Sequence, residues 1–229
     1  PIKKVDLTNM SAESGLTSWD NVMVKFPLRW IKMSKSWSTV TLSITNNPNA
    51  EDEWFQYFAH SRWTLSNPVK KSAFYMWVYE WSVSNSVLKS LSGATVYTKD
   101  NGNATMQDFI NFARANDNND WSAWYDIVWF YQRMYINALY MMKYWNIDSQ
   151  WTIWQWIVSW SKQASWWSNS IAGATGWNTW NQTSYMKLFW IENWWWNVTE
   201  WLGWLCTDWS KNLWTALSGF VGVIKTTSP

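Results

Sequence analysis

The chain has 229 residues, a net charge of +2, one cysteine and one histidine. This length suits one large domain, or one domain with an arm, and is sufficient to bury a real core. The near-neutral charge gives no argument for nucleic acid or an anionic membrane as a partner, and a single cysteine excludes an internal disulfide framework and a multi-cysteine zinc site. The start of the sequence lacks an apolar signal segment, and its uncharged runs fall short of a membrane span, so we expect a soluble protein.

Two strands are predicted near the start of the chain. Asn21 to Met33 alternates apolar and other residues up to Phe26, and Pro27 either ends this strand or places it at a sheet edge. Thr39 to Thr45 alternates cleanly and is rich in β-branched residues, which is typical of a strand, and we expect it to form a hairpin with the first. The Asn46 to Asn49 segment predicts a turn.

A third strand is predicted at Ser72 to Ser82. His60 precedes it, and one histidine without cysteine or histidine partners indicates an ordinary surface or hydrogen-bonded side chain rather than a metal ligand. We place an N-terminal β-rich part at residues 1–68 and a second part at residues 69–229, with one continuous domain as the alternative.

The middle of the chain is predicted to be helical. Thr105 is a suitable N-cap for a helix over Met106 to Asn116. Ile127 to Tyr144 is the strongest helix, and we expect its apolar stripe, with Met134 and Ala138, to be buried against the segment around Ile191 to Leu205. The remaining members of that stripe are Phe130 and Met141.

A long stretch rich in Ser, Asn, Gly and Thr follows from Ser159 to Gln182. It shows little periodicity, which predicts an exposed loop, and loops of this length are often functional. We therefore take it as the candidate ligand-binding loop.

The densest part of the chain is Leu188 to Cys206, which carries six Trp and no Lys or Arg. Side chains this apolar are expected to be buried, and the polar residues among them must then be paired or must bind an ion. Those polar residues are Glu192, Asn193, Asn197 and Glu200. Cys206 is expected to act as a small buried hydrophobe.

The segment IENWWWNVTEWLGWL, residues 191–205, resembles the IENPWGNVWEWVDGL signature of phage and prophage tail-fibre proteins. Two further blocks, residues 72–82 and 124–158, match the same proteins in the same order, through Tyr79 and Glu80 and through Asn146, Asp148 and the residues that follow. These proteins are similar to the formylglycine-generating-enzyme (sulfatase-modifying factor) branch of the C-type-lectin fold. The resemblance therefore implies an α+β, C-type-lectin-like domain that is incomplete at its C-terminal end.

The resemblance also carries expectations about function. The related enzyme uses two cysteines with copper, and Cys206 alone cannot supply that chemistry. We expect a non-enzymatic, receptor-binding structural protein of a virion tail, or otherwise of an extracellular surface. Its expected partners are a host cell-surface glycan or protein and other tail-fibre subunits in a homo-oligomer, with no nucleic acid and no membrane. A Trp-rich carbohydrate-binding module and a formylglycine-generating-type enzyme remain the alternatives.

The same branch binds calcium at the turn that matches residues 196–200. Asn197 and Glu200 are therefore candidate calcium ligands, because calcium prefers carboxylate and carbonyl oxygens. The competing interpretation is that both residues tie the turn by hydrogen bonds. Glu80, Glu192 and Glu200 could also be read as carboxylates for acid–base work, but no recurring His or Lys supports this.

The Trp content is the most unusual feature of the sequence. There are 27 Trp and 8 Gly, whereas an average usage of about 7% would give roughly 16 Gly. Many Trp stand in polar, turn-like company or at positions where the tail-fibre proteins have Gly. Our hypothesis is that the source uses an alternative genetic code, in which UGA codons are read as Gly, and that these codons appear as Trp in the present sequence. The alternative is that the Trp residues are genuine and form aromatic platforms.

This hypothesis makes geometric predictions for individual tryptophans. Some of the tryptophans at Gly-like positions should lie in tight turns or at positive φ, Trp37 should project into solvent, and Trp30, which matches an apolar position, should be buried. The Gly-like positions are Trp177, Trp190, Trp196 and Trp204; exposure is also expected at Trp63, Trp166 and Trp209, and burial at Trp201.

Overall fold

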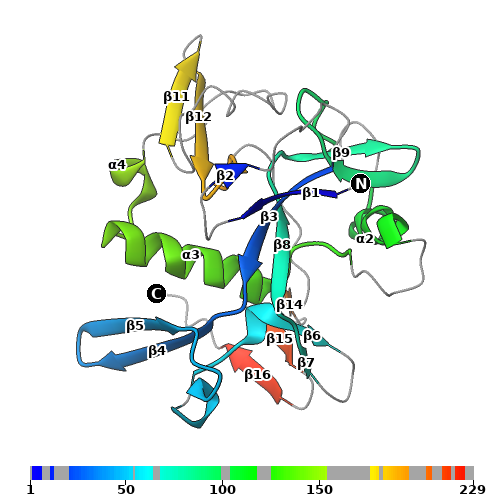
Figure 1. The fold of residues 1–229 in the computed structure, drawn as a ribbon. Helices are drawn as coiled ribbons and strands as arrows, with labels where there is room; N and C mark the ends of the chain where they lie inside the picture. Colours follow the sequence, from blue (N-terminus) through cyan, green and yellow to red (C-terminus); the bar gives the residue numbers. More distant parts are fainter. Residues whose placement is uncertain are drawn as a thin grey trace. The chain divides into compact units, whose positions relative to one another are not determined.

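Short β-sheets and a few helices make up the chain, which places it in the predicted α+β class (Figure 1). The computed structural model describes residues 2–6, 11–12, 21–53, 55–63, 68–98, 104–117, 125–153, 176–180, 183–195, 205–207, 213–217 and 220–224. Two compact units can be distinguished, each built from three chain segments. The predicted boundary between residues 68 and 69 stays a prediction.

The first unit comprises Pro1–Phe26, Tyr75–Ile127 and Tyr144–Trp201. Its largest sheet has the order β2-β1-β3-β8, in which β1 pairs antiparallel with β2 and parallel with β3. A β9–β10 hairpin and the three-stranded sheet β11-β12-β13 complete its strands. The bounds are β1 Ile2–Asp6, β2 Ser11–Ala12, β3 Asn21–Pro27, β8 Ala73–Trp77, β9 Trp81–Ser84, β10 Val87–Ser90, β11 Gly176–Trp180, β12 Thr183–Leu188 and β13 Ile191–Glu192.

Strand β3 lies in the interior of its sheet and is buried on both faces. Val22, Met23, Val24 and Phe26 are each at most 4% exposed. A strand covered on both sides does not need strict alternation, so consecutive residues can be apolar. The predicted strand is confirmed, and it ends at Pro27, which has no N–H to continue a ladder.

The third predicted strand is broken in two. β8 ends at Trp77 and β9 begins at Trp81, with a bend between them. The hydroxyl of Ser90 accepts hydrogen bonds from the N–H groups of Val78 (3.1 Å) and Tyr79 (2.8 Å). The prediction of one continuous strand was wrong because this side chain, distant in sequence, replaces the ladder partners of the bend.

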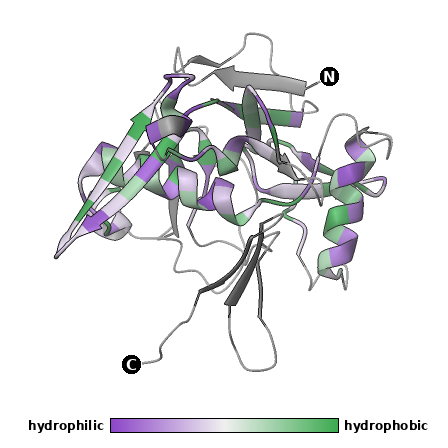
Figure 2. Cartoon of the chain, turned by 90° about the horizontal axis from the view of Figure 1, so that it is seen from below, coloured by the Kyte–Doolittle hydropathy of each residue, from purple (hydrophilic) through white to green (hydrophobic). Residues whose placement is uncertain are grey.

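Helix α2, Met106–Arg114, begins at the predicted cap. Thr105 and Asp108 form a capping box: the Thr105 Oγ1 accepts from the Asp108 N–H (3.3 Å), and the Thr105 N–H donates to Asp108 Oδ2 (2.7 Å). Its apolar side packs in a cluster through Phe109 and Ala113. Figure 2 shows hydrophobic and hydrophilic residues on different sides of this helix. The 3-10 turn η3, Ala115–Asp117, follows directly.

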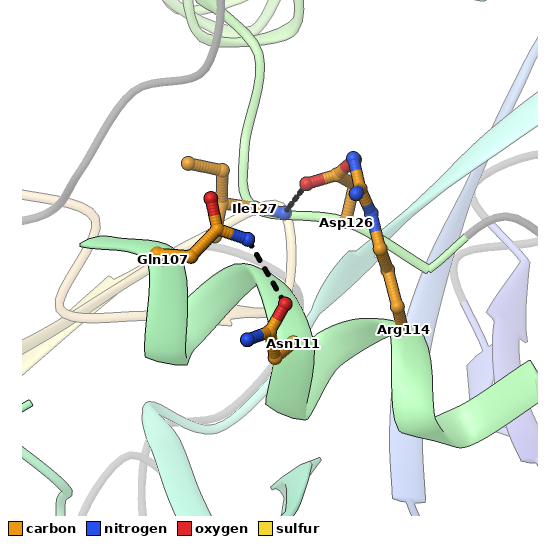
Figure 3. A network of polar contacts seen from close by, with 5 residues as sticks. All are labelled: Gln107, Asn111, Arg114, Asp126 and Ile127. Carbon is orange, nitrogen blue, oxygen red and sulfur yellow. Dashed lines mark hydrogen bonds and ion pairs between the residues drawn. The ribbon is translucent and has the colours of Figure 1, made fainter. Parts of the chain in front are cut away.

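The C-terminal end of α2 is joined to the segment after it. Arg114 donates to Asp126 Oδ2 from Nη2 (2.7 Å) and Nε (3.2 Å), and Asp126 Oδ1 accepts from the Ile127 N–H at 2.8 Å (Figure 3). Nearer the start of α2, the side chain of Gln107 donates a hydrogen bond to the side chain of Asn111 on the exposed face of the helix (Figure 3). The ion pair is partly buried, so it fixes the approach of residues 125–127 to the helix.

The second unit comprises Pro27–Phe74, Val128–Lys143 and Leu202–Pro229. It contains the β4–β5 and β6–β7 hairpins, the antiparallel sheet β14-β15-β16 and most of helix α3. The bounds are β4 Trp30–Ser36, β5 Thr39–Thr45, η1 Ala50–Glu53, η2 Phe58–His60, β6 Ser61–Trp63, β7 Pro68–Lys70, α3 Phe130–Tyr144, β14 Leu205–Thr207, β15 Leu213–Leu217 and β16 Phe220–Ile224, and the short helix α4 of the first unit is Ser149–Thr152.

Strand β5 has the predicted bounds and forms a hairpin with the second part of its predicted partner. It pairs with β4 in a two-residue hairpin, from Ser36 opposite Thr39 to Trp30 opposite Thr45. The expected partner was Asn21 to Met33, of which Trp30 to Met33 belong to β4, whereas the earlier residues form β3. Pro27 is the reason for the division, because it ends β3 and lets a separate strand begin at Trp30.

Helix α3 presents a buried face that differs from the predicted stripe. Tyr135, Ile136, Ala138 and Tyr140 are buried, whereas Met134 is 41% exposed. The prediction was right for Ala138 and wrong for Met134, because aromatic side chains occupy the buried positions beside the predicted stripe. The predicted contact of this helix with the segment around Ile191 to Leu205 stays a prediction.

Three tryptophans in the described part of the chain have a positive φ: Trp37 (54°), Trp145 (54°) and Trp190 (72°). Trp37 is the first of the two loop residues in the β4–β5 hairpin, where a type II′ turn requires Gly. Trp145 follows the last residue of α3, the usual site of a left-handed Gly cap. Trp190 is the second loop residue between β12 and β13, where type I′ turns favour Gly.

Exposure separates the tryptophans further. Trp37, Trp145 and Trp151 are 95%, 93% and 83% exposed, whereas Trp30 is 5% exposed. The predictions for Trp37, Trp30 and the positive φ of Trp190 are confirmed. The tight turn expected at Trp177 was wrong, because this residue lies within β11, opposite Met186 of β12. The other predictions fall on residues, or on side chains, outside the described part: Trp63, Trp166, Trp196, Trp201, Trp204 and Trp209. No helix of the described part is long and apolar enough to cross a membrane.

Candidate functional site: the buried polar cluster at Glu80 and Asn193

The polar residues at the start of the tail-fibre-like segment lie in the core of the first unit. Glu192 and Asn193 are 0% and 3% exposed, and Glu80, from the bend between β8 and β9, is 2% exposed. Ile191 and Glu192 form β13, which pairs with β12 and brings Glu192 opposite Lys187. The structure thus brings the bend within residues 72–82 together with Glu192 and Asn193, at the start of the block 191–205.

Both the nitrogen and the oxygen of the Asn193 side-chain amide form hydrogen bonds. Its Nδ2 donates to Glu80 Oε2 (3.2 Å), and its Oδ1 accepts from the Met186 N–H (3.3 Å). Its own N–H donates to the Met186 carbonyl (2.9 Å). These contacts need one donor and one acceptor on the same short side chain, which Asn provides. Asn also tolerates the positive φ of 47° found here better than most residues do.

Backbone contacts hold the two blocks in register. The Glu192 N–H donates to the Val78 carbonyl (2.7 Å). The Val78 N–H is shared between the Val22 carbonyl and the Ser90 hydroxyl, each at 3.1 Å. The bend that carries Glu80 is therefore fixed from three sides, by β3, β10 and β13.

A second layer of side chains fixes Ser90, and the sequence analysis missed it. Asn21 accepts from the Ser90 N–H (2.8 Å) and lies 3.4 Å from Asn116 through its Nδ2. Asn116 in turn donates to the Leu88 carbonyl (2.7 Å). These residues lie far apart in sequence and in different predicted elements, so no local pattern could have identified the network.

The cluster includes a buried cation. Lys187 is 4% exposed, and its Nζ lies 4.7 Å from the centre of the Trp190 ring. Burial lowers the pKa of Lys187, and the Glu192 carboxylate opposes that shift. A buried ammonium opposite a buried carboxylate compensates part of the charge that each brings into the core.

The geometry limits what the carboxylates can do. The carboxylates of Glu80 and Glu192 are almost completely buried, whereas acid–base work requires access to a substrate. Glu80 is engaged with the Asn193 amide. The hydrogen bonds of this cluster can hold the segments that carry Glu80 and Asn193 in place. They do so in a core with little water, where each hydrogen bond has a larger effect on position.

The candidate calcium ligands Asn197 and Glu200 lie outside the described residues, and Glu200 is also the third carboxylate of the acid–base interpretation. Within the described ranges, no group of three or more His, Cys, Asp or Glu side chains is placed to hold a metal ion. Cys206 belongs to β14, and its side chain also lies outside the described part.

The candidate binding loop, Ser159 to Gln182, is described at Gly176–Trp180 alone. Those residues form β11, which pairs with β12 from Gly176 opposite Lys187 to Trp180 opposite Thr183. The prediction of an irregular loop was wrong for this part. Its Trp and Thr residues suit a strand better than the Ser- and Asn-rich composition of the whole stretch suggested.

His60 lies in an aromatic cluster of the second unit. Its side chain is 1% exposed, with ring centres 4.8 Å from Phe74 and 4.9 Å from Tyr135. The surface alternative for His60 was therefore wrong. The apolar alternation around Phe74 was the available signal that this region is a core.

Comparisons of the chain with protein-family models, with curated proteins and with solved structures found no match.

Proposed function

We propose that this chain is a receptor-binding structural part of a phage or prophage tail fibre, built on a C-type-lectin-like domain. The observation that carries the proposal is the hydrogen bond between Asn193 and Glu80. It links two separate blocks that resemble tail-fibre proteins, within one buried core. Two blocks of one domain are expected to meet in a common core, and this contact supports the proposal for that reason.

Attachment in this proposal is non-enzymatic and depends on surface loops held by the buried core. A host cell-surface glycan or protein is the ligand, and repeated copies on a fibre multiply weak contacts into firm adsorption. Calcium bound by Asn197 and Glu200 is part of the proposal, since both residues supply oxygen ligands.

The test uses fluorescently labelled full chain and a panel of bacterial strains. We expect binding restricted to certain strains, and loss of that binding after periodate oxidation if the receptor is a glycan or after protease treatment if it is a protein. Absence of binding to every strain, together with copper-dependent oxidation of a cysteine peptide, would favour the formylglycine-generating-type enzyme instead.

A carbohydrate-binding module is the second candidate, favoured by the exposed indoles of Trp145 and Trp151. Exposed aromatic rings can stack on sugar faces. Binding of soluble polysaccharides that is lost in Trp145→Ala and Trp151→Ala, but unchanged in Trp129→Phe, would select this function over cell attachment through loops.

A further inference from the structure

The β4–β5 hairpin presents one apolar face. Its cross-strand register places five apolar residues on the same side, together with Lys35 near the turn, and the opposite side carries mostly Ser and Thr with Trp30 and Lys32. Met33 and Val40 on this face are 68% and 54% exposed. The five residues are Ile31, Met33, Val40, Leu42 and Ile44.

One edge of this hairpin is partly closed and the other is open. Ile31 of β4 exchanges hydrogen bonds with Gln56, donating at 2.9 Å and accepting at 2.8 Å, so its backbone groups point away from β5. Ile44 stands opposite Ile31, and its backbone groups must therefore point away from β4. The same holds for Val40 and Leu42, and within the described residues β5 pairs with β4 alone.

The sequence of β5 is nearly symmetric about Leu42. Its residues Thr-Val-Thr-Leu-Ser-Ile-Thr read almost the same in both directions. Antiparallel pairing with an identical strand, centred on Leu42, would set Val40 opposite Ile44 and Thr41 opposite Ser43. The centre falls on a residue whose backbone points outward, so the hydrogen-bonding pairs are the outward-pointing residues themselves.

We propose that the free edge of β5 pairs with β5 of a second copy of this chain, around a two-fold axis at Leu42. Such an interface is self-complementary, as two-fold contacts must be, because apolar residues face apolar ones and hydroxyls face hydroxyls. β5 has no charge, Pro or Gly that would protect an edge from pairing. β4, by contrast, carries Lys32 and Lys35. The proposal does not depend on the attachment function.

The experiment is a charge exchange at the axis, read as molar mass by sedimentation equilibrium of the full chain. Leu42→Lys and Leu42→Glu each place like charges face to face, and each should raise the dissociation constant by roughly tenfold or more, which corresponds to about 1.4 kcal/mol. An equimolar mixture of the two variants should associate again. Ser34→Lys, on β4 of the same hairpin, is the matched control and should associate like the wild type.

A wild-type chain that stays monomeric overturns the proposal. So does a mixture of the two Leu42 variants that fails to associate while the wild type does. Met33→Glu distinguishes packing of apolar faces from edge pairing, because Met33 shares the apolar face with Leu42 but lies on β4, away from the free edge of β5. Edge pairing predicts that this variant associates like the wild type, and its dissociation would show that the faces rather than the edges meet.

A second proposal rests on the positive φ of Trp37, Trp145 and Trp190. We propose that the protein made by its source has Gly at these positions, encoded by UGA. Each Trp occupies a different kind of turn, and each turn favours Gly for the same steric reason. The buried indole nitrogen of Trp190 also has no hydrogen-bond partner among the described residues, which is unfavourable for a buried polar group.

The test reads the gene and the peptide masses of protein isolated from its source. We expect UGA codons and glycine-containing peptides at the three turn positions. Trp30, whose Nε1 donates to Glu51 at 3.0 Å, is the control and should have a UGG codon and remain Trp. UGG codons at Trp37, Trp145 and Trp190, or tryptophan masses in their native peptides, would overturn the proposal.

Discussion

The side-chain amide of Asn193 donates a 3.2 Å hydrogen bond to Glu80, a residue 113 positions earlier in the chain. Both residues are buried, so the loss of either partner leaves a polar group in the core without its hydrogen bond.

Replacement of Asn193 should therefore be costly. Asn193→Ala is expected to lower the free energy of unfolding by about 1–3 kcal/mol, since it removes contacts to Glu80 and to the Met186 N–H. Urea denaturation measures the change. Asn111→Ala is the control, because that side chain is exposed on α2, and a change within about 0.5 kcal/mol is expected there. Equal losses in the two variants would contradict a special role for Asn193.

Glycine should stabilise the turns that now hold tryptophan. Trp37→Gly and Trp145→Gly should each raise the free energy of unfolding by about 1 kcal/mol, because they relieve strained positive-φ backbone and remove no buried contact. Chemical denaturation of each variant provides the measurement. Trp30→Gly should lower the same quantity by about 3–5 kcal/mol, since Trp30 is packed and bonded to Glu51. Destabilisation by the two turn variants would contradict the steric argument.

The buried face of α3 can be tested by truncation. Ile136 is 0% exposed, so Ile136→Ala should lower the free energy of unfolding by about 2–5 kcal/mol. Met134 is 41% exposed, and Met134→Ala should lower it by less than about 1 kcal/mol. Thermal or urea unfolding of the pair gives the comparison, and the reverse order would restore the stripe predicted from sequence.

The buried Tyr135 should make stability depend on alkaline pH. Burial raises the pKa of its hydroxyl above the ordinary value of 10.0, so the unfolded chain loses this proton at a lower pH than the folded chain does. The contribution of Tyr135 is therefore fully present below pH 10.0 and declines as the pH rises beyond it, by up to about 1.4 kcal/mol per pH unit.

Tyr135→Phe isolates this effect, because other alkaline titrations occur in both proteins. The difference in unfolding free energy between the variant and the wild type should be constant below pH 10 and should move in favour of the variant above it. Tyr75→Phe, at a residue that is 43% exposed, is the control. A difference that does not change with pH would mean that Tyr135 reaches solvent.

Some elements could be predicted because their signals are local. Thr105 with Asp108 marks the start of α2 through a capping box four residues long, and the alternation of Thr39 to Thr45 gives both ends of β5. Turns in which Trp stands where Gly is favoured could also be predicted, because Trp beside Ser or Asn is unusual in a turn of any fold.

The sequence by itself determined the capped helix, the β5 strand and the anomaly of its tryptophans, because each depends on residues within one or two turns of one another. The tertiary structure alone decided that Ser90 breaks a predicted strand at Val78, that aromatic residues rather than Met134 fill the buried face of α3, and that Asn193 meets Glu80. These outcomes depend on side chains from distant segments competing for the same space and the same backbone groups, and a one-dimensional pattern does not contain that competition.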